Sequence, residues 1–242
     1  MEAFRRTQYR EEDDLTEGTD WTDGRTRRHF ISKVLVIIGF QMAFTAGCTV
    51  GVLFWPLAIN MFQKEKYLMY IGAGGMFVGS SVIFCCRRLS RKVPINYFLL
   101  FVYTIFTTMM VCSTTVYYQT NLILYAFGTT VLLCICLTIF AMCFPCDFTG
   151  YGPFLCVTGF ATFAVGILAF VMKDPLVQMI YLGISLILFS LYLVYDIQLM
   201  VGRHKNQYCE EDYIIAALSI YSDIIRMFIT LLQLIARIRS NN

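Results

Sequence analysis

The sequence predicts an all-α polytopic membrane protein, a bundle of seven transmembrane helices. Of its 242 residues, 58% are hydrophobic and only 14% are charged, and the mean hydropathy is +0.65. A water-soluble domain of this size needs a more polar surface to cover its core. Many of the charges lie in residues 1–33, and seven apolar runs follow. Each run has about 20 to 25 residues, so as a helix it crosses a hydrocarbon core of about 30 Å.

The runs cover about residues 33–58, 67–86, 95–117, 121–142, 152–172, 176–200 and 213–236. They are longer than the strands of an outer-membrane barrel and lack their period-two alternation, so helices are predicted. The connections are short, and we therefore expect sequential helices to be antiparallel neighbours. Gly47 and Gly51, and likewise Gly75 and Gly79, have the spacing that lets membrane helices approach closely. We expect this packing within one bundle and a monomeric protein.

The polar ends frame this domain. Residues 1–30 form a charged tail that we expect to be disordered and that lacks a signal peptide, 31–238 form the transmembrane domain, and 239–242 are a short polar end. Of the Lys and Arg residues near the predicted membrane ends, ten lie on the N-terminal side and five on the other. They are Arg25, Arg27, Arg28, Lys33, Arg87, Arg88, Arg91, Lys92, Arg203 and Lys205, against Lys64, Lys66, Lys173, Arg237 and Arg239. The positive-inside rule then places the N-terminus in the cytoplasm. The last run can be spanning or re-entrant, because it contains Asp223 and Arg226.

Nothing in the composition predicts a resident cofactor or a nucleic-acid partner. The ten cysteines lie mostly in apolar runs, where they act as small hydrophobic side chains. The pair Cys143 and Cys146 lacks a second pair or a suitable histidine, so no metal–thiolate site is predicted. No basic face or recognition motif favours nucleic acid.

Two aspartates interrupt the last two apolar runs. Asp196 lies near the end of the sixth run and Asp223 in the middle of the seventh. A charge at the centre of a membrane helix costs about 3 kcal/mol, so such a residue usually marks an ion, proton or substrate pathway. The alternative is an aspartate that reaches water from a helix end. Both positions are equally distant from the connecting loop at Cys209–Glu210, so an antiparallel hairpin places them at similar depth, within about two turns.

Two carboxylates in a low-dielectric site cannot both ionise cheaply, so we expect Asp196 and Asp223 to share a proton and to titrate as a unit. When both are ionised, their oxygens suit calcium. The sequence therefore predicts a proton-sensitive cation path in which these two residues are the metal ligands.

Several stretches resemble one family. They are "FSLYLVYDIQLMVGR" and "EEDYIIAALSIYSDIIRMFITLLQLI", supported by "RRHFISKV", "PINYFLLFVYTIF" and "CDFTGYGPFL". Over residues 27–238 the chain resembles the transmembrane Bax-inhibitor-motif family, and more closely its lifeguard branch. The resemblance implies a seven-helix bundle whose last helix is central. It also implies a pH-sensitive calcium leak across an intracellular membrane, endoplasmic reticulum or Golgi, with an anti-apoptotic effect.

The resemblance also assigns residues. The family's two gating aspartates match Asp196 and Asp223. A family arginine that latches onto the sixth-helix aspartate matches Arg87, with Arg88 as the adjacent alternative. We expect Arg91 in the following loop to have no such role.

The sequence departs from the family pattern at three positions. Ile197 replaces a threonine, Ser222 replaces a leucine, and Arg226 replaces a neutral residue. Residues three apart on a helix can touch, so Arg226 is expected to favour ionised Asp223 and to repel an entering cation. The alternative is that Arg226 points to another face.

Three other functions remain open. A non-conducting membrane protein could inhibit apoptosis by binding its regulators, with the acidic tail as a contact. A proton-coupled transporter lacks support from any visible inverted repeat. An intramembrane aspartyl protease fits Tyr195 and Asp196, but "IYS" before Asp223 lacks the glycines that admit a peptide. We therefore expect no enzyme activity, and calcium flux in liposomes separates conduction from binding.

Overall fold

The computed structural model describes residues 24–86, 90–143, 147–172, 174–202 and 206–241. Within these ranges there is no strand, and seven helices are long and apolar enough to cross a membrane. These are α2 (Gly24–Phe54), α4 (Tyr67–Cys85), α6 (Ile95–Thr115), α7 (Thr120–Cys143), α8 (Gly152–Met172), α9 (Pro175–Val201) and α10 (Tyr213–Asn241). Short helices are α3 (Pro56–Lys64), η2 (Phe148–Tyr151) and η3 (Glu210–Asp212). The predicted all-α polytopic fold is confirmed.

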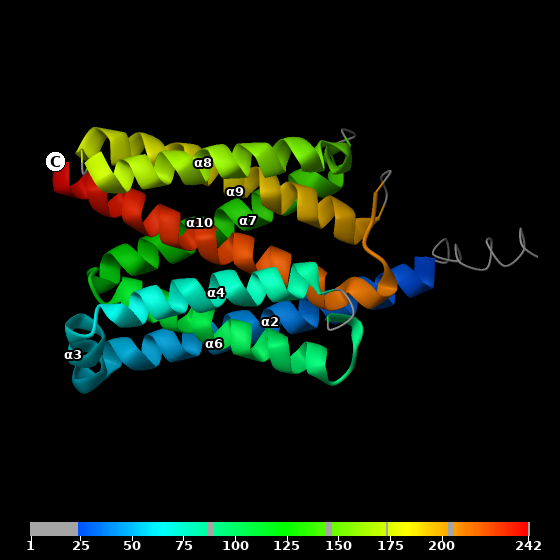
Figure 1. Cartoon of the computed structure of the whole chain (residues 1–242), viewed down its shortest axis with the longest axis horizontal. Helices are drawn as coiled ribbons and strands as arrows, with labels where there is room; N and C mark the ends of the chain where they lie inside the picture. Colours follow the sequence, from blue (N-terminus) through cyan, green and yellow to red (C-terminus); the bar gives the residue numbers. More distant parts are fainter. Residues whose placement is uncertain (1–23, 87–89, 144–146, 173, 203–205, 242) are drawn as a thin grey trace, which may run out of the picture.

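Helix α10 lies at the centre of the bundle. Of its apolar window, 89% is buried inside the protein, against 11–44% for the other six spanning helices. Helices α2, α4 and α6 pack together on one side of it, and α7, α8 and α9 on the other (Figure 1). The central last helix that the family resemblance implies is confirmed.

The same helix is uninterrupted from end to end. Its 29 residues span about 43 Å at 1.5 Å per residue, which exceeds the thickness of a hydrocarbon core. It crosses the whole bundle, from the end where α9 stops to the C-terminus at the opposite end (Figure 1). A re-entrant segment must turn back on itself, so the shape of α10 favours the spanning alternative. Its Asp223 and Arg226 are accommodated because protein, not lipid, surrounds the helix.

The first helix differs from the prediction at both ends. It begins at Gly24, inside the segment expected to be a disordered tail, because Arg27 and Phe30 are buried against the bundle. It stops at Phe54, because Pro56 has no N–H to continue the helix. Helix α3 follows with Pro56 in its first turn, and it exposes Leu57 and Met61 on the surface.

The glycine prediction holds for one pair and fails for the other. A Cβ on Gly75 would lie 2.3 Å from the ring of Phe106, and one on Gly79 would lie 3.2 Å from Tyr103, so these glycines let α4 approach α6. A Cβ on Gly47 or Gly51 would have no neighbouring atom within 4 Å. The expected packing at that pair is wrong, because both glycines lie on the exposed face of α2.

Candidate functional site

A cavity of about 600 Å³ lies between α9, α10 and the loop that joins them. Arg91 and Asp212 line it at the end of the bundle where α10 begins, and Asp223 and Arg226 line its deeper part. Asp196 contributes from α9. Polar and charged groups thus converge in a hollow between α9 and α10.

The structure brings the two aspartates together. Asp196 is 8% exposed and Asp223 is 3% exposed, and their carboxyl groups are direct neighbours within the cavity. One carboxylate oxygen, Asp223 Oδ2, is buried without a hydrogen-bond partner. Two adjacent carboxyl groups with an unused acceptor can share a proton or hold a cation.

Local signals in the sequence build the helical hairpin that carries this pair. Asp174 caps the start of α9 by accepting hydrogen bonds from Leu176 N and Val177 N. Gly202 ends α9 in the left-handed conformation, with φ of 67°, and its N–H donates to Gln198 O. Glycine adopts this conformation without strain. The chain then turns through η3 into α10, which places Asp223 opposite Asp196.

Tyr208 of this loop closes over the pair. Its hydroxyl donates a hydrogen bond to Asp196 Oδ1 at 3.0 Å. Burial, and next the negative charge of Asp196, raise the pKa of Tyr208 well above its ordinary value. The phenol therefore keeps its proton and remains a donor at neutral pH. We did not predict Tyr208 from the sequence, and its place in a polar loop gave no signal for it.

Arg27 fixes the loop from the opposite side. Its guanidinium donates to Leu199 O at 2.5 Å, to Tyr208 O at 2.8 Å and to Val201 O at 3.3 Å. A Cβ on Gly202 would lie 2.6 Å from this guanidinium. A cation suits the carbonyls at the end of a helix, which have no partners within the helix. From the sequence, Arg27 is recognisable only as a positive-inside charge, because its carbonyl partners lie more than 170 residues away.

Arg226 faces the cavity rather than another side of α10. Its Nη1 lies 3.8 Å from Asp223 Oδ1, and its guanidinium carbon is 5.8 Å from the centre of the Phe189 ring. About a third of its side chain, 36%, remains exposed. The contact between residues three apart is present, at a distance that makes it a loose ion pair.

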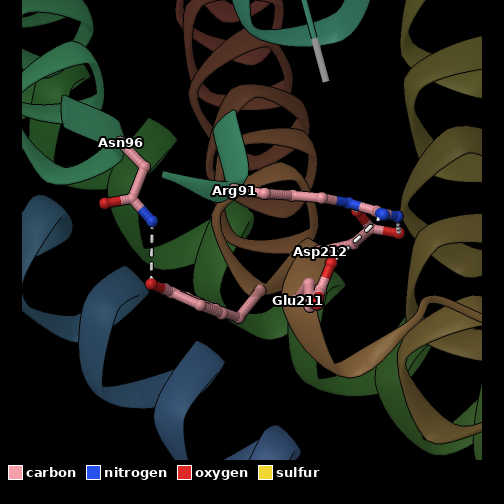
Figure 2. A network of polar contacts seen from close by, with 5 residues as sticks. Arg91, Asn96, Glu211 and Asp212 are labelled. Carbon is pink, nitrogen blue, oxygen red and sulfur yellow. Dashed lines mark hydrogen bonds and ion pairs between the residues drawn. The ribbon is translucent and has the colours of Figure 1, made fainter. Parts of the chain in front are cut away.

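At the cavity mouth, Arg91 is bound to η3, just before α10 begins (Figure 2). It donates to both carboxylate oxygens of Asp212, at 2.9 and 3.2 Å, and lies 3.2 Å from Glu211. The hydrogen bond to Asp212 raises the pKa of Arg91. Nearby, Asn96 Nδ2 donates to the Tyr213 hydroxyl at 2.8 Å. The contacts of Arg91 with Asp212 and Glu211 were not predicted from the sequence. The expectation that Arg91 does not act as the latch on Asp196 stays a prediction.

The predicted latch cannot be placed in the same way. Arg87 and its alternative Arg88 lie outside the residues that the structure describes. Their pairing with Asp196 stays a prediction from the resemblance.

Residues 27–241 match the family described as Inhibitor of apoptosis-promoting Bax1. The chain belongs to this family. It is 32% identical to human Protein lifeguard 3 and 28% identical to mouse Protein lifeguard 3. Each match covers 89% of this chain, and 70% and 71% of the respective relative. It is also 25% identical to the Golgi anti-apoptotic protein of vaccinia virus strain Lister, over 93% of this chain and 92% of that protein.

In this Bax1-inhibitor family member, the described residues contain no group of three or more His, Cys, Asp or Glu side chains placed to hold a metal ion. The deeper part of the cavity instead offers the two carboxylates of Asp196 and Asp223, together with the hydroxyls of Tyr208 and Ser222. Two carboxylates with few further ligands suit transient contact with a passing cation better than tight storage.

Proposed function

We propose that this protein is a pH-sensitive calcium leak channel of an intracellular membrane with a cytoprotective, anti-apoptotic role. The observation that carries the proposal is the adjacent pair Asp196 and Asp223, buried in a cavity of a membrane helix bundle, with Asp223 Oδ2 unpartnered. Buried ionisable groups in membrane helices are costly, so they persist where function needs them.

The pair supplies the pH dependence. Two like charges about 4 Å apart repel by about 4 kcal/mol at an effective dielectric near 20. A shared proton relieves this repulsion and lets the two helices stay together, which is the closed state. Loss of the proton leaves two negative charges that a calcium ion balances. Acidic pH therefore favours closure, and the ionised pair favours calcium entry.

The names of the relatives support the cellular role. One relative is called a Golgi anti-apoptotic protein, and the family name describes inhibition of apoptosis. We extend an anti-apoptotic function and a Golgi or endoplasmic reticulum membrane to this chain. With the N-terminus cytoplasmic, the cavity mouth at Arg91 and Asp212 opens to the cytoplasm.

Calcium flux into liposomes that contain the purified protein tests the proposal. Wild-type flux should fall as the pH becomes acidic, and both Asp196→Asn and Asp223→Asn should abolish this dependence. The matched control is Asp174→Asn. Asp174 is exposed at the start of α9, and asparagine keeps the helix cap. That variant should keep the wild-type pH profile.

Two results would count against the proposal. If both aspartate variants keep the wild-type profile, the pair is not the pH sensor. If a well-folded wild-type protein carries no calcium, conduction is wrong and the alternative of a non-conducting protein that binds apoptosis regulators takes its place. A pull-down with and without residues 1–23 then tests that alternative.

A further inference from the structure

A second cavity lies near the C-terminal end of α10, away from the aspartate pair. It has a volume of about 310 Å³ and is lined by Tyr118, Gln233, Ala236, Arg237 and Ser240. The polar residues of α10 among these are spaced by four and three positions, so they share one face of the helix. Tyr118 approaches them from the connection between α6 and α7. Small-molecule sites occupy about 300–1,000 Å³, and this cavity therefore has room for a small polar group.

Hydrogen-bond donors dominate the lining of this second cavity. The guanidinium of Arg237 carries several N–H groups, the amide of Gln233 has an NH2 group, and Tyr118 and Ser240 each have a hydroxyl. Among the residues that the structure describes, the lining contains no carboxylate. Within the same residues, the side chains of Tyr118, Gln233 and Ser240 have no hydrogen-bond partner. Unused donors around one positive charge favour an anion over a cation.

Arg237 is held in position by a neutral partner. Its Nη2 donates to Gln178 Oε1 of α9, and Gln178 Nε2 donates to Ala169 O of α8 at 3.3 Å. Asp174, one turn before Gln178, instead accepts N–H groups at the start of its own helix. In the described part of the chain, Arg237 forms no ion pair with a carboxylate. A guanidinium fixed at one nitrogen can still present its other N–H groups to a phosphate.

Tyr118 lies close enough to Arg237 for both to contact one ligand. Both line the same cavity, and the tyrosine is within reach of the arginine's charge. Burial raises the pKa of Tyr118, and the positive charge of Arg237 opposes part of that rise. The phenol therefore keeps its proton at neutral pH and remains a donor. A ligand that accepts from both residues joins the end of α10 to the connection between α6 and α7.

The second cavity lies at the level of a membrane surface. Helix α6 ends at Thr115 and α7 begins at Thr120, so Tyr118 lies between two spanning helices. Helix α3 and the C-terminus lie at the same end of the bundle (Figure 1). Trp55, just before α3, and Tyr117 are exposed there, as is typical of aromatic residues at the level of lipid headgroups. The phosphates of phospholipids occupy this level.

We propose that the second cavity binds a phosphate group, supplied by the headgroup of a membrane phospholipid. Arg237 makes the charge-assisted contacts, and Tyr118, Gln233 and Ser240 donate to the remaining oxygens. Free phosphate shares this chemistry, but the position at the membrane surface favours a lipid. Ile238, the exposed neighbour of Arg237, offers an apolar surface beside the headgroup. The site goes beyond the proposed calcium leak, because it needs neither the aspartate pair nor conduction.

Native mass spectrometry of the purified full-length protein, titrated with phosphatidylglycerol in detergent, tests the site. Arg237→Gln should weaken lipid binding by about tenfold or more, because the charged partner of the phosphate is lost. Arg237→Lys keeps the charge without the paired N–H groups and should lie between the two. The matched control is Arg239→Gln. Arg239 is exposed in the last turn of α10 and does not line the cavity, so this variant should bind like the wild type.

Thermal unfolding separates the possible sources of the phosphate, because a ligand of the folded state raises the Tm. Phosphatidylglycerol should raise the Tm of the wild type more than that of Arg237→Gln, and diacylglycerol, which lacks the phosphate, should not. A rise with inorganic phosphate alone that also depends on Arg237 supports the phosphate site and assigns it a soluble ligand.

Two results overturn the site. They are equal losses of lipid binding in Arg237→Gln and Arg239→Gln, and a wild type that binds neither phosphatidylglycerol nor inorganic phosphate. If Arg237→Gln does not fold, Tyr118→Phe takes its place, because it removes one donor from the cavity. Weaker lipid binding in that variant supports the site, and unchanged binding overturns it.

Discussion

The Tyr208 hydroxyl lies 3.0 Å from Asp196 Oδ1, and it joins the loop between α9 and α10 to the aspartate pair. The carbonyl of the same tyrosine accepts a hydrogen bond from Arg27 Nη1 at 2.8 Å. The start of the first helix is thereby coupled to the site through one residue. We therefore expect that a displacement of Arg27 changes how Tyr208 covers the carboxylates.

Replacing Tyr208 by phenylalanine should increase the calcium leak at neutral pH. The change removes one hydrogen bond to a carboxyl group, which contributes about 1.5–3 kcal/mol when that group is charged. If the bond holds the closed state, its loss should raise flux by about tenfold or more, measured in liposomes. Tyr117→Phe is the control, because Tyr117 is an exposed loop tyrosine at the other end of the bundle. A leak that rises equally in both variants would point to general loosening.

The same tyrosine predicts behaviour in alkali. Its pKa in the folded protein is raised above that in the unfolded chain, which is about 10. Its contribution to stability is therefore complete below that value and is lost as the pH rises toward the folded pKa. Wild-type protein should lose thermal stability more steeply above about pH 10 than Tyr208→Phe does. Parallel curves for the two proteins, from thermal unfolding in detergent across a pH series, would contradict this.

Arg27→Ala should destabilise the protein and raise the leak together. It removes the side-chain donor from the carbonyls of Val201 and Tyr208, and it leaves Leu199 O with only the N–H of Tyr208, at a cost of about 2–3 kcal/mol. Arg27→Lys should recover only part of this, because an ammonium group cannot reproduce the geometry of the guanidinium. Arg28→Ala is the control, since Arg28 is the exposed neighbour. Thermal unfolding and calcium flux are both measured, and wild-type values for Arg27→Ala would exclude the coupling.

Arg226→Asn should increase calcium flux. At about 6 Å and an effective dielectric near 20, a positive charge repels calcium by about 6 kcal/mol before the screening by Asp223. Even a small remainder matters, because about 1.4 kcal/mol changes affinity tenfold. The pH midpoint of flux should also move upward, since ionised Asp223 loses the cation 3.8 Å away. A folded variant with unchanged flux and midpoint would show that the exposed part of Arg226 leaves it too well solvated to matter.

Arg91→Ala should loosen the cavity mouth. The bidentate contact with Asp212 is partly exposed, so we expect a loss of only about 1 kcal/mol of stability, smaller at high salt. The adjacent Lys92→Ala is the control, because Lys92 is exposed. Thermal unfolding at low and high salt measures the effect. Equal losses in both variants would assign it to surface charge in general.

Hydrophobic length alone predicted the number of spanning helices and most of their limits, because the thickness of a bilayer sets a local requirement on each run. The two aspartates could also be recognised from the sequence alone, because a carboxylate within an apolar run is identified from its immediate neighbours in the chain. Their equal distance from the loop predicted that they meet, because an antiparallel hairpin places such residues at similar depth.

Tertiary structure alone decided which other side chains reach the pair. Arg27 contacts carbonyls more than 170 residues away, and Gln41 and Thr104 face each other across 63 residues. Whether a polar side chain of a helix faces lipid, a neighbour or a cavity depends on how the helix is rotated in the bundle. Gly47 and Gly75 share one motif and have opposite surroundings for this reason. Local composition determined what crosses the membrane, and only the packing of the helices determined which polar groups meet inside it.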